Sequence, residues 1–187
     1  MTRGDGAPED SPKVAGVILA GGRARRMGGG DKGLQALAGQ PLIAHVIARG
    51  GPQVAALAIN ANGDPARFAD FALPVVQDSV SGFAGPLAGV LAGLDWAAEA
   101  APDCDWLATF ACDAPFFPED LVGRLSAEVR AAGADLACAR GLAPRRQPGP
   151  QEVPPGSTRL GASPGLTRRP SRRAGSTLSD RSPARSS

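Results

Sequence analysis

VAGVILAGGRARRMGGGDKG, residues 14–33, joins an uncharged apolar stretch to a loop of glycine and basic residues. Residues 14–20 are rich in branched side chains, as expected of a strand that is covered on both faces in an α/β sheet. Gly21 and Gly22 allow the backbone to turn tightly and to approach a ligand. Free backbone N–H groups in such a loop bind anions, and basic side chains around them neutralise a polyphosphate. The segment therefore predicts a triphosphate site with these basic residues: Arg23, Arg25, Arg26 and Lys32.

Two better-known phosphate motifs do not fit this loop. Gly28, Gly30 and Gly33 match G-x-G-x-x-G by letter, but dinucleotide-binding glycines lie in the turn that leaves the strand, and these come later. A Walker loop requires G-K-[ST], whereas Lys32 lies between Asp31 and Gly33, so no hydroxyl is placed for magnesium. The loop is therefore predicted to be a nucleotide-binding loop of another kind.

The composition divides the chain into two parts. The 187 residues are 43% hydrophobic, which suits one domain with its own core. Residues 1–141 carry more acidic than basic side chains, whereas residues 142–187 carry nine arginines against Glu152 and Asp180. The second part also has eight prolines, eight serines and no aromatic residue. It buries too little apolar surface to offset the entropy of ordering, so we expect a disordered basic tail over 142–187.

The expected tail has two interpretations. A basic segment binds nucleic acid electrostatically, but without an aromatic residue for base stacking such binding is non-specific. Arg, Pro, Ser and Gly are also what GC-rich coding DNA yields when it is translated out of frame. We favour this second hypothesis, in which the tail is a frameshift product and the domain over residues 14–141 is incomplete at its C-terminal end. The polar residues 1–13 are expected to be a disordered N-terminal segment.

Cysteine usage and the N-terminus indicate a cytoplasmic protein. The three cysteines form no C-x-x-C pair, and their odd number gives no disulfide framework. Residues 1–13 contain no apolar core of a secretory signal. The longest apolar stretch, residues 84–101, contains two acidic residues and is expected to be an amphipathic helix rather than a membrane span. We therefore expect no membrane partner.

Short apolar runs alternate with helical patterns along the chain. The predicted strands are residues 14–20, 56–61, 73–77, 106–111 and 135–139. Helices are predicted after Pro41, where Leu42, Ile43, Val46 and Ile47 share one face, and over 87–100 and 118–132. This alternation predicts βαβ units, hence an α/β fold with a Rossmann-like, mainly parallel sheet and helices on both faces.

Polar residues follow several of these strands. Ligands of such sheets lie beyond the carboxyl ends of the strands, which are the places of Gly21–Lys32, Asn60, Asn62, Asp78 and Asp113. Because a hard carboxylate oxygen suits magnesium, Asp113 is the candidate metal ligand, although it is also suited to capping a following helix. For Asn60 and Asp78, ordinary turn positions at strand ends are an equally good interpretation.

Other reactive side chains have simpler interpretations. His45, the single histidine, lies between apolar residues and is expected to be packed or hydrogen-bonded rather than a catalytic base. Cys112 is expected to be a small buried residue. Asp103 and Asp105 precede their strand, so they are expected at the opposite edge of the sheet as solvated charges.

The pattern L-A-G-G-x-A-x-R-M-G-x-x-D-K resembles the signature of the molybdenum cofactor guanylyltransferases, a family of MobA-like nucleotidyltransferases. It is carried by Leu19, Ala20, Gly21, Gly22, Ala24, Arg26, Met27, Gly28, Asp31 and Lys32. Further matching residues are Pro41-Leu42, Asn60-Ala61-Asn62, Asp78, Gly85-Pro86-Leu87-Ala88-Gly89 and Cys112-Asp113-Ala114-Pro115. The resemblance covers residues 13 to 140.

The resemblance implies transfer of GMP from Mg-GTP to molybdenum-molybdopterin, which gives the guanine dinucleotide cofactor and pyrophosphate. Molybdoenzymes or their chaperones are the implied recipients of that cofactor. The residues implied to be catalytic are Arg26, Lys32 and Asp113, with Asp113 as the magnesium ligand. The residues implied to bind nucleotide are Leu19, Ala20, Gly21, Gly22, Lys32, Asn60, Asp78 and Asp113.

Three alternatives stay open. Cytidylyltransferases of the same cofactor typically show L-A-A-G where this chain has L-A-G-G, which favours guanine. Sugar-phosphate nucleotidyltransferases share the fold but match Met27-Gly28 and Asp31-Lys32 less well. A third alternative is a protein that binds GTP without transferring it, because the family's C-terminal residues near the metal and molybdopterin do not appear in residues 142–187.

Overall fold

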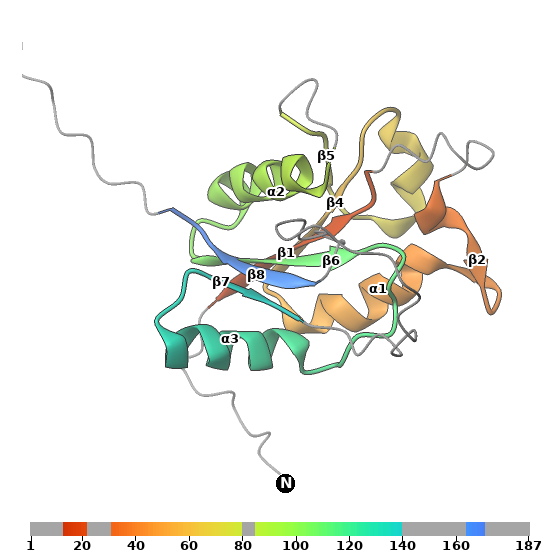
Figure 1. Ribbon diagram of the computed structural model, residues 1–187. Helices are drawn as coiled ribbons and strands as arrows, with labels where there is room; N and C mark the ends of the chain where they lie inside the picture. The colour runs from red at the N-terminus through yellow and green to blue at the C-terminus, as the bar shows by residue number, and fades with distance from the viewer. Residues whose placement is uncertain (1–12, 22–30, 80–84, 140–163, 171–187) are drawn as a thin grey trace, which may run out of the picture.

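The computed structural model describes residues 13–21, 31–79, 85–139 and 164–170 (Figure 1). Within them lies a six-stranded sheet with the strand order β5-β4-β1-β6-β8-β7. Its strands are β1 (Val14–Leu19), β4 (Ala56–Asn60), β5 (Val75–Val76), β6 (Trp106–Ala111), β7 (Leu136–Cys138) and β8 (Gly165–Arg168). The α-helices are α1 (Leu42–Gly50), α2 (Pro86–Ala100) and α3 (Leu121–Ala132). Short 3₁₀ helices are η1 (Lys32–Leu34), η2 (Gly51–Gln53) and η3 (Pro65–Phe71).

Strand β1 is the centre of a parallel ladder. It pairs with β4 on one side, from Ala15 opposite Ala56, and with β6 on the other, from Val14 opposite Trp106. Strand β5 extends the same parallel set beyond β4. The predicted α/β fold with a mainly parallel sheet is therefore confirmed, and the strands that were predicted from the sequence are all present.

The prediction of a wholly disordered tail over residues 142–187 is wrong for β8. This strand lies between β6 and β7 and runs antiparallel to both, with Ala108 opposite Leu166 and Ala137 opposite Leu166. Leu166 is completely buried, and the adjoining Arg169 donates to the carbonyls of Ala97 and Pro102. Composition averaged over the tail does not resolve a strand of four residues in which Leu166 is the single large apolar side chain.

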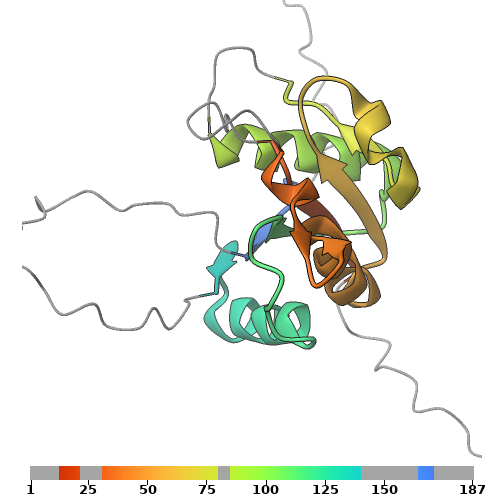
Figure 2. The ribbon, with the colours of Figure 1, turned by 90° about the vertical axis from the view of Figure 1, so that its right-hand side faces the viewer.

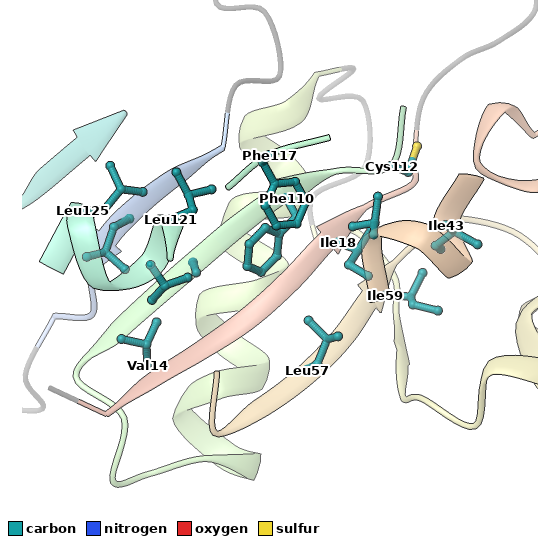
Figure 3. Packing of buried hydrophobic residues seen from close by; sticks show 14 of the residues in the cluster. Val14, Ile18, Ile43, Leu57, Ile59, Phe110, Cys112, Phe117, Leu121 and Leu125 are labelled. Atoms are coloured by element: carbon teal, nitrogen blue, oxygen red, sulfur yellow. The ribbon is translucent and has the colours of Figure 1, made fainter. Parts of the chain in front are cut away.

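The helices cover the sheet on its two faces. In Figure 1, α2 lies above the sheet and α1 and α3 lie below it, and Figure 2 shows the same layers from the side. Alternate side chains of β1 point to opposite faces: Ala15 and Val17 pack with α2, whereas Val14 and Ile18 join the larger core beneath. Figure 3 shows this larger core, in which the rings of Phe110 and Phe117 stack with centroids 5.1 Å apart.

A small hairpin that the sequence analysis missed precedes α1. Strands β2 (Ala36–Leu37) and β3 (Gln40–Pro41) pair antiparallel, and Nε2 of His45 lies 2.9 Å from the carbonyl oxygen of Leu37. The two-residue strands are too short to give a periodic signal. His45 is therefore held by the hairpin, as expected of a hydrogen-bonded rather than a catalytic histidine.

None of the helices in the described ranges is long and apolar enough to cross a membrane.

Helix α2 approaches β1 closely because small residues face the sheet. A Cβ atom at Gly93 would lie 2.8 Å from Cγ1 of Val17 and 3.0 Å from Cδ2 of Leu107. By contrast, a Cβ atom at Gly123, on the exposed side of α3, would meet nothing within 4 Å. The sequence thus sets the distance between helix and sheet through the missing side chain of Gly93.

We expect Gly93→Ala to lower the free energy of unfolding by about 1–3 kcal/mol, because the added methyl overpacks the sheet. Gly123→Ala is the control and should raise it by roughly 0.5–1 kcal/mol through helix propensity. Urea unfolding followed by circular dichroism measures both. Equal effects of the two substitutions would contradict the close packing of α2 on β1.

Candidate functional site

The carboxyl ends of the central strands are joined by hydrogen bonds that continue the ladders. The backbone N–H of Ala20 donates to the carbonyl of Asn60 at 2.9 Å, and that of Cys112 donates to the carbonyl of Leu19 at 3.3 Å. These bonds place the ends of β1, β4 and β6 at one edge. Leu19, Ala20 and Gly21 are half-buried at its centre, where a ligand can approach their backbone.

Two asparagines hold the carboxylate of Asp78. Nδ2 of the buried Asn60 donates to Oδ1 of Asp78 at 2.9 Å, and Nδ2 of the exposed Asn62 donates to Oδ2 at 2.6 Å. The backbone N–H of Asp78 returns a bond to Oδ1 of Asn62 at 2.9 Å. Each carboxylate oxygen has a further lone pair, so Asp78 is fixed in direction and can still accept from a ligand.

Asn60 is itself held in place by packing. Its Nδ2 also donates to the carbonyl of Val76 at 3.2 Å, and only 2% of the residue is exposed. Cβ atoms at Gly21 and Gly89 would lie 3.3 Å and 2.3 Å from Oδ1 of Asn60. Gly89 on α2 therefore has a role at the edge that the sequence analysis did not assign, while a Cβ at Gly85 would meet nothing within 4 Å.

A second packing contact at this edge, between Gly33 and Cys112, lies next to Lys32 and Asp113. A Cβ atom at Gly33 would lie 3.3 Å from Cβ and 3.5 Å from Sγ of Cys112, so the backbone that carries Lys32 packs against the residue before Asp113. Both Lys32 and Asp113 are exposed. A cation and a carboxylate that follow two neighbouring strands are thus presented to solvent near each other.

The pKa of the Cys112 thiol depends on burial and on the charges of Asp113 and Lys32. Burial raises the pKa of Cys112 to about 11, and the negative charge of Asp113 adds to this rise. The charge of Lys32 acts in the opposite direction and lowers the pKa. Cys112 is therefore a protonated core residue near neutral pH, as the sequence analysis expected.

The loop that carries Asp113 and the start of α3 are tied to α1 and η2. Helix α3 begins at Leu121 with Asp120 at the N-cap position, which eliminates the capping interpretation of Asp113. Nη1 of Arg49 donates to the carbonyl of Phe117 at 2.9 Å, and Gln53 accepts from the backbone N–H of Val122 at 2.9 Å. The described ranges contain no hydrogen bond or ion pair to the carboxylate of Asp113.

Several predicted residues lie outside the described residues, namely Gly22, Arg23, Ala24, Arg25, Arg26, Met27 and Gly28. Asp103 and Asp105 precede β6, as expected, and Asp103 lies 3.9 Å from Nζ of Lys13 before β1. They are at the amino end of strands whose carboxyl ends carry Gly21 and Asp113. The sequence analysis placed Asn62 at the end of its strand but did not predict its hydrogen bonds with Asp78.

The carboxylate oxygens at the edge suit a hard cation whose remaining ligands come from a bound substrate and from water. In the described part of the chain, no three His, Cys, Asp or Glu side chains gather as a metal cluster. Magnesium typically takes only one or two carboxylates and completes its shell with substrate phosphates and water. The exposed carboxylate of Asp113, which has no partner among the described residues, meets that requirement. The edge therefore presents the exposed side chains of Lys32 and Asp113 beside the half-buried backbone of Leu19–Gly21.

Residues 16–161 match the family model described as the MobA-like NTP transferase domain. The match spans most of the chain, from the third residue of β1 to beyond β7. The chain belongs to this family of nucleotidyltransferase domains.

Curated relatives match about two thirds of the chain. A molybdenum cofactor guanylyltransferase of Rhodopseudomonas palustris (strain BisB5) is 57% identical over 130 residues, which are 70% of this chain and 62% of the relative. One of Bradyrhizobium sp. (strain ORS 278) is 58% identical over 126 residues, 67% of this chain and 59% of the relative. The chain thus spans about three fifths of the length of these relatives.

Solved structures support the fold alone. A homologue from Mycobacterium sp. strain JC1 of the Mycobacterium tuberculosis protein Rv0371c aligns with a TM-score of 0.54 at 24% identity, over 67% of this chain and 62% of that one. A CMP:2-keto-3-deoxy-manno-octonic acid synthetase complexed with CTP aligns with a TM-score of 0.53 at 14% identity, over 84% of this chain and 74% of that one.

The burial of the thiols predicts their reactivity. At pH 8 we expect a disulfide reagent to label the exposed Cys138 rapidly, and the buried Cys104 and Cys112 only on unfolding. With its pKa raised to about 11, Cys112 holds only roughly 0.1% thiolate at that pH, and its thiolate fraction rises about tenfold per pH unit below that value.

The Cys138→Ser variant should lose the rapid phase, and mass spectrometry of the labelled peptides identifies the residue. Labelling of Cys112 as fast as that of Cys138 would contradict the packing of Gly33 on Cys112.

Proposed function

We propose that this chain transfers GMP from Mg-GTP to molybdenum-molybdopterin, giving the molybdopterin guanine dinucleotide cofactor and pyrophosphate. The observation that carries the proposal is the gathering of Leu19–Gly21, Lys32, Asp78 and Asp113 at one edge of the sheet. Membership in the MobA-like family and the names of the curated relatives support the same reaction. Molybdoenzymes or their chaperones are the proposed recipients of the product.

Asp78 is the proposed guanine ligand. A guanine base presents two N–H donors side by side, at N1 and N2, and a carboxylate accepts both in a planar, bidentate arrangement. Asn60 and Asn62 each donate to one oxygen of this carboxylate, at 2.9 and 2.6 Å. Cytosine presents an acceptor where guanine has N1–H, so a fixed carboxylate discriminates against it. This supports guanylyl over cytidylyl transfer.

The phosphates are proposed to lie over the end of β1. Backbone N–H groups after Leu19 would donate to phosphate oxygens, with Lys32 beside them as a point charge. Gly22 and Arg26, which follow in the sequence, are the further proposed phosphate contacts. Asp113 would hold magnesium, which when bound neutralises phosphate charge and polarises the α-phosphate.

The chain's own contribution to transfer is position and charge. A terminal phosphate oxygen of molybdopterin attacks the α-phosphorus of GTP, the bond from the α-phosphorus to its bridging oxygen breaks, and pyrophosphate leaves with that oxygen. The nucleophile is already an anion, so no general base is needed. Lys32 and the backbone of Leu19–Gly21 would stabilise the charge that develops on the α-phosphate and leaving group.

A second candidate function is GTP binding without transfer. It is favoured by one observation: the match with the curated relatives covers only about three fifths of their length. Nucleotide binding and transfer are therefore measured separately. For the 187-residue chain we expect GTP binding with transfer weaker than that of a full-length relative.

Calorimetric titration with Mg-GTP tests the nucleotide site. We expect selective binding over CTP, and a loss of about 2 kcal/mol, or roughly 30-fold in affinity, in Asp113→Asn. Asp105→Asn is the matched control, because it removes an exposed carboxylate from the opposite end of the same strand. Its affinity should equal that of the wild type. Equal losses in the two variants would refute the assignment of Asp113, and absence of GTP binding in the wild type would refute the proposed function.

The choice of base depends on the charge of Asp78. In Asp78→Asn an amide replaces one acceptor by a donor, so we expect GTP affinity to fall by roughly 2 kcal/mol while the weak CTP affinity stays the same. Inosine triphosphate, which lacks the N2 amine, should bind the wild type more weakly than GTP does. The Asp78→Asn substitution should lower the affinity for inosine triphosphate much less than it lowers the affinity for GTP. A parallel loss for all three nucleotides would show that Asp78 contacts the sugar rather than the base.

A further inference from the structure

Arg67 joins two loops of the edge that are distant in sequence. Its Nε lies 2.8 Å from Oδ2 of Asp31, and its Nη2 donates to the carbonyl of Asn62. The side chains of Arg67 and Asp31 are each 29% exposed, so the pair is shielded from most of the solvent. Ion pairs in such surroundings are screened less than exposed ones.

The guanidinium of Arg67 is itself held on several sides. Its Cζ lies 5.0 Å from the ring centroid of Phe68, a residue that is only 1% exposed. Gly63 has a φ of +89°, and a Cβ there would lie 3.1 Å from Nη1 of Arg67. Oδ1 of Asp64 caps η3 by accepting from the N–H of Ala66 at 2.9 Å, which fixes the turn that carries Arg67. The side chain is therefore confined to one place.

The two loops that Arg67 joins carry the two halves of the proposed site. Asp31 directly precedes Lys32, the proposed phosphate ligand. Asn62 donates to Asp78, the proposed base ligand, at 2.6 Å. The chain Asp31, Arg67, Asn62 and Asp78 is a continuous set of polar contacts between the phosphate half and the base half.

We propose that Arg67 is a positioning residue that sets the distance between the phosphate-binding and base-binding halves of the nucleotide site. This inference rests on the proposed function. Because its charge is taken up by Asp31, Arg67 acts through Lys32 and Asp78 rather than by touching the nucleotide. Its planar guanidinium places Nε beside the carboxylate of Asp31, as an ion pair, while Nη2 donates to the carbonyl of Asn62. A lysine with a single ammonium group cannot make both contacts in the same geometry.

The test is a double-mutant cycle in Mg-GTP affinity, measured at a temperature well below the melting point of every variant. Arg67→Ala and Asp31→Asn are each expected to weaken binding about tenfold, and the double variant no more than either alone, because both remove one shared contact. Arg67→Lys should recover only part of the loss. The dependence of the melting temperature on GTP concentration gives a second measurement of the same affinities.

Arg169→Ala is the matched control. Arg169 is also half-buried and donates to two carbonyls, those of Ala97 and Pro102, but it follows β8 at the far end of the sheet. It should lower the melting temperature and leave the GTP affinity of the folded protein unchanged.

The other outcomes overturn the proposal in distinguishable ways. Tighter binding by Asp31→Asn would mean that a released Arg67 binds phosphate directly, and additive losses in the double variant would mean that the two residues act separately. Wild-type affinity in Arg67→Ala, with GTP bound by the wild type, would overturn the role of Arg67 alone. No GTP binding by the wild type would overturn the proposed function together with it.

Discussion

The parallel pairing of β1 with both β4 and β6 is the constraint on which the site depends. Three strands that run in the same direction end at the same edge, and their last hydrogen bonds, from Ala20 to Asn60 and from Cys112 to Leu19, carry the alignment into the loops. The burial of Ala15, Val17 and Ile18 on both faces stabilises this alignment. A shift of one residue in either pairing would reverse the faces of the side chains and separate the loops.

Asn60 links the packing of α2 to the orientation of Asp78. The close approach of α2, permitted by Gly89, confines the Asn60 amide, and the amide in turn directs Asp78. The helix therefore contributes to the site without presenting a polar group to it. A site supported in this way keeps its geometry before a ligand arrives, which reduces the cost of ordering side chains on binding.

The parts of this architecture that could be predicted from the sequence are those with a local signal. The apolar run of β1, the glycine turn after it and the alternation of strands and helices predicted the α/β sheet, and the strand ends predicted where Asn60, Asp78 and Asp113 lie. Strand β8 could not be predicted, since Gly165–Arg168 acquires its conformation from pairing with β6 and β7 on either side. The β2–β3 hairpin is local, but its two-residue strands are too short to give a periodic signal. The contacts of Asn62 and Gly89 are non-local, because each involves a residue far along the chain.

The charges at the edge explain why a cation belongs to the proposed chemistry. Asp31 and Asp113 bring carboxylates to the phosphate half of the proposed site and Asp78 brings one to its base half, and bare carboxylates repel phosphate. Arg67 is paired with Asp31, and Asn60 and Asn62 bind Asp78 without changing its charge. Asp113 faces solvent with its charge uncompensated by any partner in the described ranges, and Lys32 stands near it. A divalent ion on Asp113 would convert this repulsion into an attraction for the triphosphate, so nucleotide and metal are expected to bind together rather than independently.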